Sequence, residues 1–258
     1  MAFTIAVAGK GGTGKTTIAA LSVRYITEVM GKSVSAIDAD PNASLGMALG
    51  VTVDKTIADL RDDVIERRMG IPTGMSKEAY IEYSIEECII EKDKFDFLTM
   101  GRPEGPKCYC YVNNLLRKYM DRVGNSYPYV VIDNEAGMEH LSRRTTNNVD
   151  LLLLVCEPTL IGVVSAQRII KLASELPIIV KGKAVVLNRV TKGGLSPAIQ
   201  NKLGEFGMDV SLSIGYDQEI YDAASNGTSL LKLSEQNESF RAVGNLLSSY
   251  INVEVMSK

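Results

Sequence analysis

A glycine-rich loop near the start of the chain has the residue types needed to bind a chain of phosphates. Residues 9–17 read G-K-G-G-T-G-K-T-T, after an apolar run and before a helical pattern. Backbone N–H groups in such a loop converge on an anion, and the positive end of the following helix strengthens that attraction. In a G-x-x-x-x-G-K-[ST] pattern the lysine, here Lys15, reaches the β- and γ-phosphates, and the Thr16 hydroxyl binds Mg²⁺. The expected nucleotide contacts are Gly9, Lys10, Gly11, Gly12, Thr13, Gly14, Lys15, Thr16 and Thr17.

Three of these glycines also match the fingerprint of a dinucleotide site. Gly9, Gly11 and Gly14 spell G-x-G-x-x-G, and Asp38 ends the second predicted strand, where an acidic residue would hold a ribose. That fingerprint has no need for Lys-Thr directly after its last glycine, whereas a nucleoside triphosphate site does. We therefore interpret the segment as a phosphate-binding loop.

Carboxylates follow two of the predicted strands, where they would lie beside that loop. An apolar strand over residues 129–133 ends at Asp133, the first residue of a D-x-x-x-G pattern, and Asp38 and Asp40 follow a strand over 33–37. In an open α/β sheet, ligands bind outside the carboxyl ends of the strands. A carboxylate there binds Mg²⁺ directly or through water. The spacing therefore predicts a magnesium-binding edge next to the phosphates.

Asn188 and Arg189 follow a further strand, over residues 184–187, and are candidates for contacts with the base. An asparagine amide offers a donor and an acceptor together, which matches the N6/N7 edge of adenine. A guanine-specific site would present an aspartate, as in N-K-x-D, and none follows Asn188. We therefore expect ATP and ADP rather than GTP, with the loop over residues 215–218 closing on the base.

Two cysteines form a C-x-C pattern before a predicted helix over residues 111–122. The start of a helix lowers a thiol pKa, so Cys108 and Cys110 are expected to be thiolates. Two thiolates are too few for a closed four-coordinate site, but a two-fold dimer would supply four. Such a site takes Zn²⁺ in a tetrahedron or Ni²⁺ in a square plane, and the ligand type does not choose between them. Cys88 and Cys156 are expected to be buried apolar residues instead.

An alternation of strands and helices must position these residues. Strand patterns cover residues 3–8, 33–37, 95–100, 127–133, 151–155, 184–187 and 210–214. Helical patterns cover residues 15–31, 78–91, 111–122, 165–176 and 235–251, with short helical patterns between residues 43 and 70. This alternation predicts an α/β fold, a mostly parallel twisted sheet with helices on both faces, in one domain over residues 1–258.

Composition excludes several classes of protein. The 258 residues carry a net charge of −3 and contain no long basic run, so we expect no nucleic-acid partner. Apolar runs stay well short of about 18 residues, so we expect no membrane span. The chain opens directly on a strand pattern, which predicts no signal peptide. Four cysteines without a secretory context indicate a reducing compartment, and we expect the protein in the cytoplasm.

The second lysine in the loop, Lys10, carries a resemblance to a known class of ATPases. The sequence G-K-G-G-T-G-K-T-T resembles the deviant phosphate loop of SIMIBI-class ATPases, which include the nitrogenase iron protein, the Min and Par positioning ATPases and metal-insertion ATPases. The resemblance implies that Lys10 reaches the nucleotide of a partner subunit in a homodimer. It also implies that Asp40 orients the attacking water, that Asp38 supports Mg²⁺ from behind, and that Asn188 contacts adenine.

Two further segments resemble the nickel-insertion ATPases of carbon monoxide dehydrogenase, the CooC type. They are residues 101–117, which contain the C-x-C pattern, and residues 133–144. The resemblance implies that Cys108 and Cys110 bind nickel at a dimer interface. It further implies ATP hydrolysis during maturation of a nickel–iron–sulfur centre in carbon monoxide dehydrogenase or the related acetyl-CoA synthase. His140, the one histidine, is either an auxiliary ligand, a partner contact or a structural residue.

Two other functions fit the same class of ATPases less well. An electron-transfer ATPase like the nitrogenase iron protein needs a cysteine just after the D-x-x-x-G pattern, and residues 133–144 contain none. A Min-type switch needs a basic amphipathic helix at its carboxyl end, but the pattern over residues 240–251 has no basic cluster. A Par-type switch binds DNA through a basic surface, which the net charge disfavours.

Overall fold

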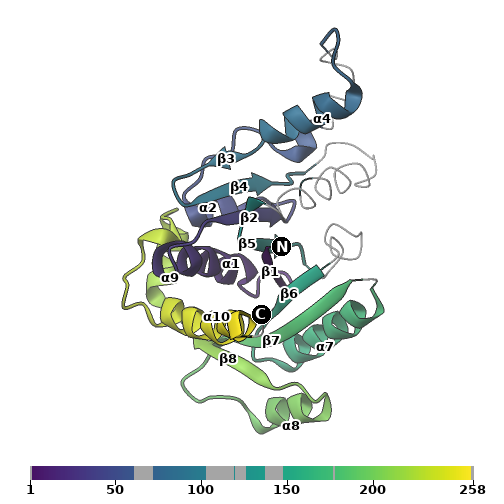
Figure 1. Cartoon of the computed structure of the whole chain (residues 1–258). Coiled ribbons are helices and arrows are strands. Elements are labelled where there is room, and N and C mark those ends of the chain that lie inside the picture. Colours follow the sequence, from purple (N-terminus) through teal and green to yellow (C-terminus); the bar gives the residue numbers. More distant parts are fainter. Residues whose placement is uncertain are drawn as a thin grey trace.

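A computed structural model describes residues 2–60, 72–102, 119, 126–136, 148–176 and 178–256. Within these ranges, eight strands form one sheet in the order β3-β4-β2-β5-β1-β6-β7-β8 (Figure 1). The strands are β1 Phe3–Gly9, β2 Val34–Ala39, β3 Ile90–Glu91, β4 Phe95–Thr99, β5 Tyr129–Asn134, β6 Asn148–Cys156, β7 Ile179–Val190 and β8 Val210–Gly215. Among the described strands only β3 runs antiparallel to its neighbour, so the predicted α/β fold with a mostly parallel sheet is confirmed.

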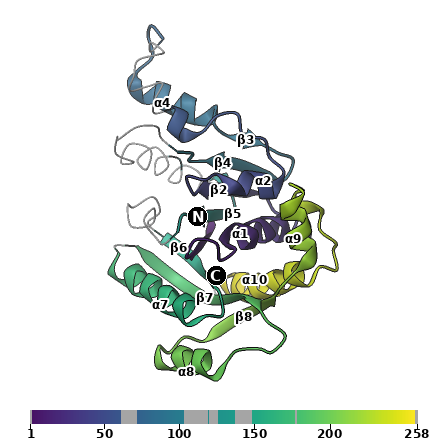
Figure 2. The ribbon, with the colours of Figure 1, turned by 180° about the vertical axis from the view of Figure 1, so that it is seen from behind.

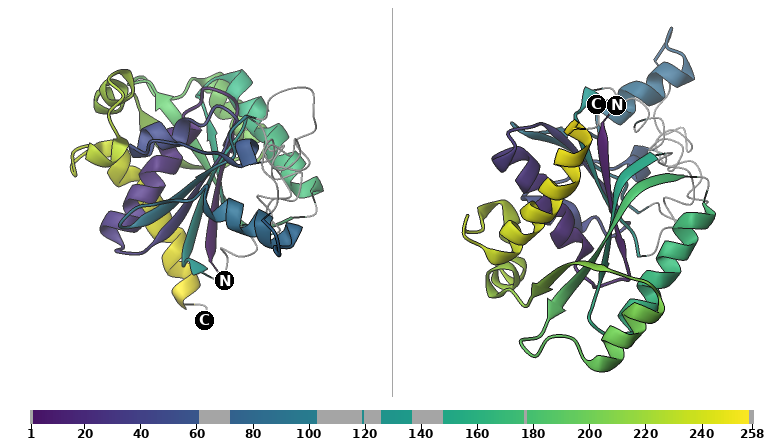
Figure 3. Two further views of the ribbon diagram at one scale, coloured as in Figure 1. Left: turned by 90° about the horizontal axis from the view of Figure 1, so that it is seen from above. Right: turned by 60° about the horizontal axis from the view of Figure 1, so that its bottom comes forward.

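Helices cover both faces of this sheet (Figure 3). They are α1 Lys15–Arg24, the π-helix η1 Tyr25–Val29, α2 Ser44–Leu49, α4 Lys77–Glu86, α7 Leu160–Glu175, α8 Pro197–Glu205, α9 Gln218–Ser225, the 3-10 helix η2 Leu230–Lys232 and α10 Glu238–Met256. Helices α1, α2 and α10 pack on one face, while α4, α7 and α8 pack on the other. Seen from behind, α4 and α8 lie at opposite ends of the sheet (Figure 2).

The central strand β1 shows why the sheet needs two layers of helices. Its side chains alternate between the faces, so Ile5 and Val7 join the core under α1 and α10, while Ala6 and Ala8 join the core under α7. All seven residues of β1 are buried. A strand buried on both faces reads as a continuous apolar run, which is typical of parallel sheets.

Several predicted boundaries are wrong. The pattern over residues 78–91 is not one helix: α4 ends at Glu86, and Ile90 then pairs with Phe97 across the antiparallel β3–β4 ladder. Amide donation from Cys88 to Ile85 and from Ile89 to Glu86 tightens the last turn and ends the helix. The predicted strand over 184–187 is the middle of the longer β7.

Other elements begin elsewhere or were not predicted. Helix α7 begins at Leu160 rather than 165, because the Thr159 hydroxyl caps it by accepting a hydrogen bond from the Gly162 amide. Helices α8 and α9 had no sequence prediction. The predicted helix over 111–122 falls almost entirely outside the described residues. No helix in the described ranges has both the length and the apolar character needed to cross a bilayer.

Candidate functional site

The phosphate loop connects β1 to α1 at the carboxyl edge of the sheet. Gly12 and Gly14 have φ of 81° and 95°, which only glycine adopts readily. A Cβ atom on Gly14 would lie 2.3 Å from the Asn188 amide nitrogen, and one on Gly9 would lie 2.2 Å from the Val155 carbonyl oxygen. Both glycines therefore allow other chain segments to approach the loop backbone closely. Lys15 is buried at the start of α1, and Lys10 is exposed.

The predicted magnesium-binding residues are brought together beside this loop. Asp38 and Asp133 pair in register on β2 and β5, and both are fully buried. The Thr16 hydroxyl donates a hydrogen bond to Asp133 Oδ2 at 2.6 Å. Within the described part of the chain, Asp133 Oδ1 is buried and has no hydrogen-bond partner. Oxygen ligands with an unsatisfied carboxylate oxygen fit Mg²⁺, which prefers such a set.

Burial changes the acidity of both aspartates. The pKa of Asp38 rises to about 8, chiefly through burial and also through the neighbouring charge of Asp133, while hydrogen bonds from the Leu45 and Asp40 amides oppose the change. The pKa of Asp133 rises to about 6, also chiefly through burial, while the hydrogen bond from Thr16 and the charge of Lys15 oppose the change. Because ionisation is unfavourable for both neighbouring carboxyl groups, a nearby cation would stabilise their ionised forms.

Asp38 and Asp40 also shape the turn that follows β2. Asp38 accepts hydrogen bonds from the amides of Asp40 at 3.1 Å and Leu45 at 2.7 Å. Asp40 Oδ1 accepts from both the backbone and the side chain of Asn42 at 2.9 Å. Between these bonds lies Ala43, with φ of 51°, a strained conformation for a residue with a Cβ. The catalytic role of Asp40 stays a prediction.

Asn188 and Arg189 hold the phosphate loop from its other side. The Asn188 amide donates to the Thr13 carbonyl at 2.9 Å, and its oxygen accepts from the Arg189 amide at 3.0 Å. Arg189 has φ of 61°, and its guanidinium donates to the Gly12 carbonyl at 3.0 Å and to Glu157 at 2.9 Å. Sequence reasoning assigned Asn188 to adenine and missed this support of the loop. A contact between residues 175 positions apart leaves no local pattern to read.

A cavity of about 140 Å³ opens beside Asn188, between α1 and α9. Three of the four residues of the predicted base loop, Gly215, Tyr216 and Asp217, line this cavity, while the closure of the loop on a base stays a prediction. Tyr216 and Tyr221 stand together on one wall of the cavity, with ring centroids 6.0 Å apart. Apolar and aromatic walls with one amide suit a planar heterocycle. The other lining residues are Thr17, Ile18, Leu21, Arg189, Ile214, Ile220, Ala224 and Ser239.

The cysteines fall into two groups. Cys88 and Cys156 are buried, as predicted, and burial raises the pKa of the Cys156 thiol to about 11, which disfavours metal binding there. Cys108 and Cys110, together with His140, lie outside the described residues. Over the ranges that the structure describes, no group of three or more His, Cys, Asp or Glu side chains could hold a metal ion.

The parallel sheet, the loop and the paired aspartates define a P-loop nucleotide-binding protein. Residues 4–230 match the model of the CobQ/CobB/MinD/ParA nucleotide-binding domain. The chain belongs to this family and is an ATP-binding, MinD/ParA-type ATPase.

Relatives of this chain differ in their stated roles. An uncharacterized ATP-binding protein of Methanocaldococcus jannaschii is 41% identical over 250 residues, covering 96% of this chain and 98% of that protein. The carbon monoxide dehydrogenase accessory protein CooC of Rhodospirillum rubrum is 32% identical and covers 89% and 90%. Among solved structures, septum site-determining protein MinD of Pyrococcus horikoshii with Mg-ADP has a TM-score of 0.73 at 19% identity, covering 100% of this chain and 99% of that one, which shows a shared fold.

Proposed function

We propose that this ATPase is a nickel-binding maturation factor for carbon monoxide dehydrogenase or the related acetyl-CoA synthase, acting in the cytoplasm as a homodimer. The observation that carries the proposal is the 32% identity to the CooC accessory protein over nine-tenths of both chains. The C-x-C pattern at Cys108 and Cys110 supplies the thiolate chemistry that such a role needs. Nickel is the cargo, and Zn²⁺ is a possible competitor at the same thiolates.

In this proposal ATP lies along residues 9–17, with Lys15 on its β- and γ-phosphates. Thr16 would hold Mg²⁺ with Asp38 and Asp133 behind it, and a bound Mg²⁺ supplies charge neutralisation on the phosphates. Asp40 would orient the attacking water. Lys10 of a second copy would add a positive charge where negative charge develops in the transition state.

Hydrolysis would be coupled to the cargo through the turn after β2 and the segment that begins at Asp133. Asp38 connects the two, because it pairs in register with Asp133 and holds the amide of Leu45 at the start of α2. A change in the charges beside Asp38 would therefore move both segments together. Identical nickel affinity in the empty, ADP-bound and ATP-bound protein would contradict this coupling.

The deciding experiment is light scattering after gel filtration of metal-stripped protein, with and without one Ni²⁺ per two chains, together with metal analysis of the peak. We expect a nickel-dependent dimer that holds one metal and is lost in a Cys108→Ala, Cys110→Ala double variant. Cys88→Ala, at a buried cysteine, is the matched control and should behave as wild type. Nickel retained equally by the double variant would overturn the proposal.

The second candidate is a positioning switch of the Min or Par kind. Septum site-determining protein MinD of Bacillus subtilis is 24% identical over 86% of this chain and 79% of that protein, and the solved MinD structures share the fold. Such a switch hydrolyses ATP but has no use for paired thiolates. The same nickel experiment separates the candidates, since a switch would bind no nickel through Cys108 and Cys110.

A further inference from the structure

We infer that Asn237, assisted by Ser239, is a positioning residue for nucleotide binding, because it fixes the loop that walls the cavity beside Asn188. The inference rests on the ATPase site and on placing the base in that cavity. It does not depend on nickel or on the identity of a client enzyme.

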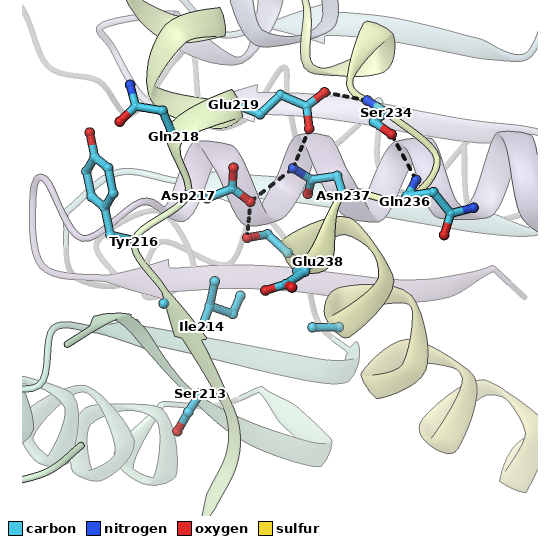
Figure 4. A pocket seen from close by; sticks show the side chains of 13 residues that line it. Ser213, Ile214, Tyr216, Asp217, Gln218, Glu219, Ser234, Gln236, Asn237 and Glu238 are labelled. Atoms are coloured by element: carbon cyan, nitrogen blue, oxygen red, sulfur yellow. Dashed lines mark hydrogen bonds between the residues drawn. The ribbon is translucent and has the colours of Figure 1, made fainter. Parts of the chain in front are cut away.

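Asp217 is the centre of the hydrogen-bond network that carries this inference (Figure 4). Its Oδ2 accepts from the Asn237 amide at 3.0 Å and from the Ser239 hydroxyl at 2.6 Å. Its Oδ1 accepts from the Ile220 amide at 3.1 Å and so caps α9. One carboxylate therefore joins the base loop, the start of α9 and the start of α10.

Both polar atoms of the Asn237 side chain form hydrogen bonds in this network. The residue is buried, and its nitrogen donates to Glu219 at 2.9 Å as well as to Asp217. Its oxygen accepts from the Phe240 amide at 2.9 Å and caps α10. The other Glu219 oxygen accepts from the Ser234 amide. One buried amide nitrogen thus donates to two carboxylates, that of Asp217 in the base loop and that of Glu219 in the first turn of α9.

The loop depends on these bonds because little of it is buried after Ile214. Ile214, Gly215, Tyr216 and Asp217 line the cavity of about 140 Å³ beside Asn188. The same four residues also line a second cavity of about 490 Å³, together with residues from the starts of α9 and α10 (Figure 4). Ile214 is packed in the core, but Gly215 and Tyr216 are exposed and Asp217 is only partly buried, so the hydrogen bonds of Asp217 determine where the loop after β8 lies.

The start of α10, next to Asn237, packs against α1, the helix that follows the phosphate loop. The Arg24 guanidinium near the end of α1 lies 4.1 Å from the centre of the Phe240 ring. Gly244 of α10 lies against Tyr25, where a Cβ atom would come within 2.6 Å of the ring. These contacts fix the start of α10 relative to α1. Asn237, just before α10, then fixes the position of the base loop through its hydrogen bond to Asp217.

The test compares ligands with and without a base. An Asn237→Ser variant keeps a side-chain cap for α10 but can no longer bridge to both Asp217 and Glu219. We expect its dissociation constant for ADP, measured by calorimetry, to rise about tenfold, while that for inorganic triphosphate stays unchanged. The KM for ATP should rise by a similar factor, with kcat within twofold of wild type. Ser239→Ala should give a smaller change in the same direction.

Ser196→Ala is the matched control, because it removes a helix cap of the same kind from α8, away from both cavities. It should lower the melting temperature without changing either ligand's affinity. Equal weakening of ADP and inorganic triphosphate in Asn237→Ser would overturn the inference, since the effect would then lie at the phosphates. Unchanged ADP binding in both Asn237→Ser and Ser239→Ala would overturn it as well.

Discussion

The two sides of the nucleotide site are held in place in different ways. On the phosphate side, the loop's own residues set most of the conformation, with glycines in the left-handed region at Gly12 and Gly14 and α1 directly after them, and Asn188 and Arg189 add hydrogen bonds to it. On the base side, the wall over residues 215–217 has no such local requirement and is tied down by Asn237 and Ser239, about 20 residues further along.

The two sides also treat their carboxylates in opposite ways. Asp38 and Asp133 are buried next to each other, and burial raises the pKa of both. Asp217, on the base side, accepts three hydrogen bonds from neighbouring elements. The comparison teaches that Asp38 and Asp133 are costly to ionise until a bound cation neutralises them. Asp217, in contrast, already has its hydrogen-bond partners and holds the base loop in a fixed position.

The largest effect is expected on the phosphate side. Lys15→Ala should lower kcat for ATP hydrolysis by at least about 100-fold, because the variant loses the buried cation that we propose lies on the β- and γ-phosphates. Steady-state phosphate release measures the change, and the nickel content of the same protein should stay as in wild type. Hydrolysis above a tenth of the wild-type rate would show that the loop does not work through Lys15.

A smaller effect is expected at Arg189, near the end of β7, whose side chain supports the phosphate loop. Arg189→Ala should raise the KM for ATP about tenfold, because the Gly12 carbonyl loses a charge-assisted hydrogen bond. Glu157→Gln removes only a half-exposed ion pair of the same guanidinium, and exposed pairs contribute little. It should therefore leave KM within twofold. Equal KM values in the two variants would mean that the Gly12 contact is unimportant.

The raised pKa of Asp38 predicts that the stability of the folded protein depends on pH. The pKa of Asp38 is raised from 3.8 to about 8 by folding, so the folded protein binds a proton that the unfolded chain has lost. The stabilisation is complete below about pH 4 and disappears as the pH rises through about 8.

Urea unfolding at pH 7, 7.5 and 8, without Mg²⁺ or nucleotide, lies above most of the titration of Asp133, whose pKa is about 6, and therefore reports mainly on Asp38. The free energy of unfolding should fall with pH, by at most about 1.4 kcal/mol per pH unit from this group. In Asp38→Asn the slope should flatten. A slope unchanged by the substitution would assign the dependence to other groups.

The smallest effect is expected at the strained turn after β2. Ala43→Gly should stabilise the nucleotide-free protein by about 0.5–1 kcal/mol, because glycine adopts a φ of 51° without a Cβ clash. Ala48→Gly, inside α2, is the control of opposite sign and should destabilise by about 1 kcal/mol. Denaturant titration measures both, and destabilisation by Ala43→Gly would refute the strain.

The phosphate side was predictable from sequence, and the reason is local. The motif at residues 9–17 and the aspartates after β2 and β5 follow from short patterns, and parallel strands bring their carboxyl ends to one edge. The parallel arrangement of β2 and β5 is therefore enough to explain why Asp38 lies next to Asp133. The fold class was predictable for the same reason, since alternating strand and helix patterns specify the layers.

The base side was predictable only in outline. The loop after β8 was expected near the base, but neither Asn237 nor its bonds to Asp217 and Glu219 had a signal in the sequence. The hydrogen bond from Asn188 to the phosphate loop was missed for the same reason, because it joins strands that are distant in sequence. The helix predicted over 78–91 failed because an antiparallel pairing with β4 took its last residues.

The position of β1 in the middle of the sheet has a consequence for synthesis of the chain. This strand is made long before its partners, because Phe3 pairs with Tyr129 and Ile5 pairs with Leu151. At roughly 5–20 residues per second, its partners leave the ribosome many seconds later. During that delay an uncharged, β-prone segment has no sheet to join, so a nascent chain that stalls before β5 would depend on chaperones to avoid aggregation.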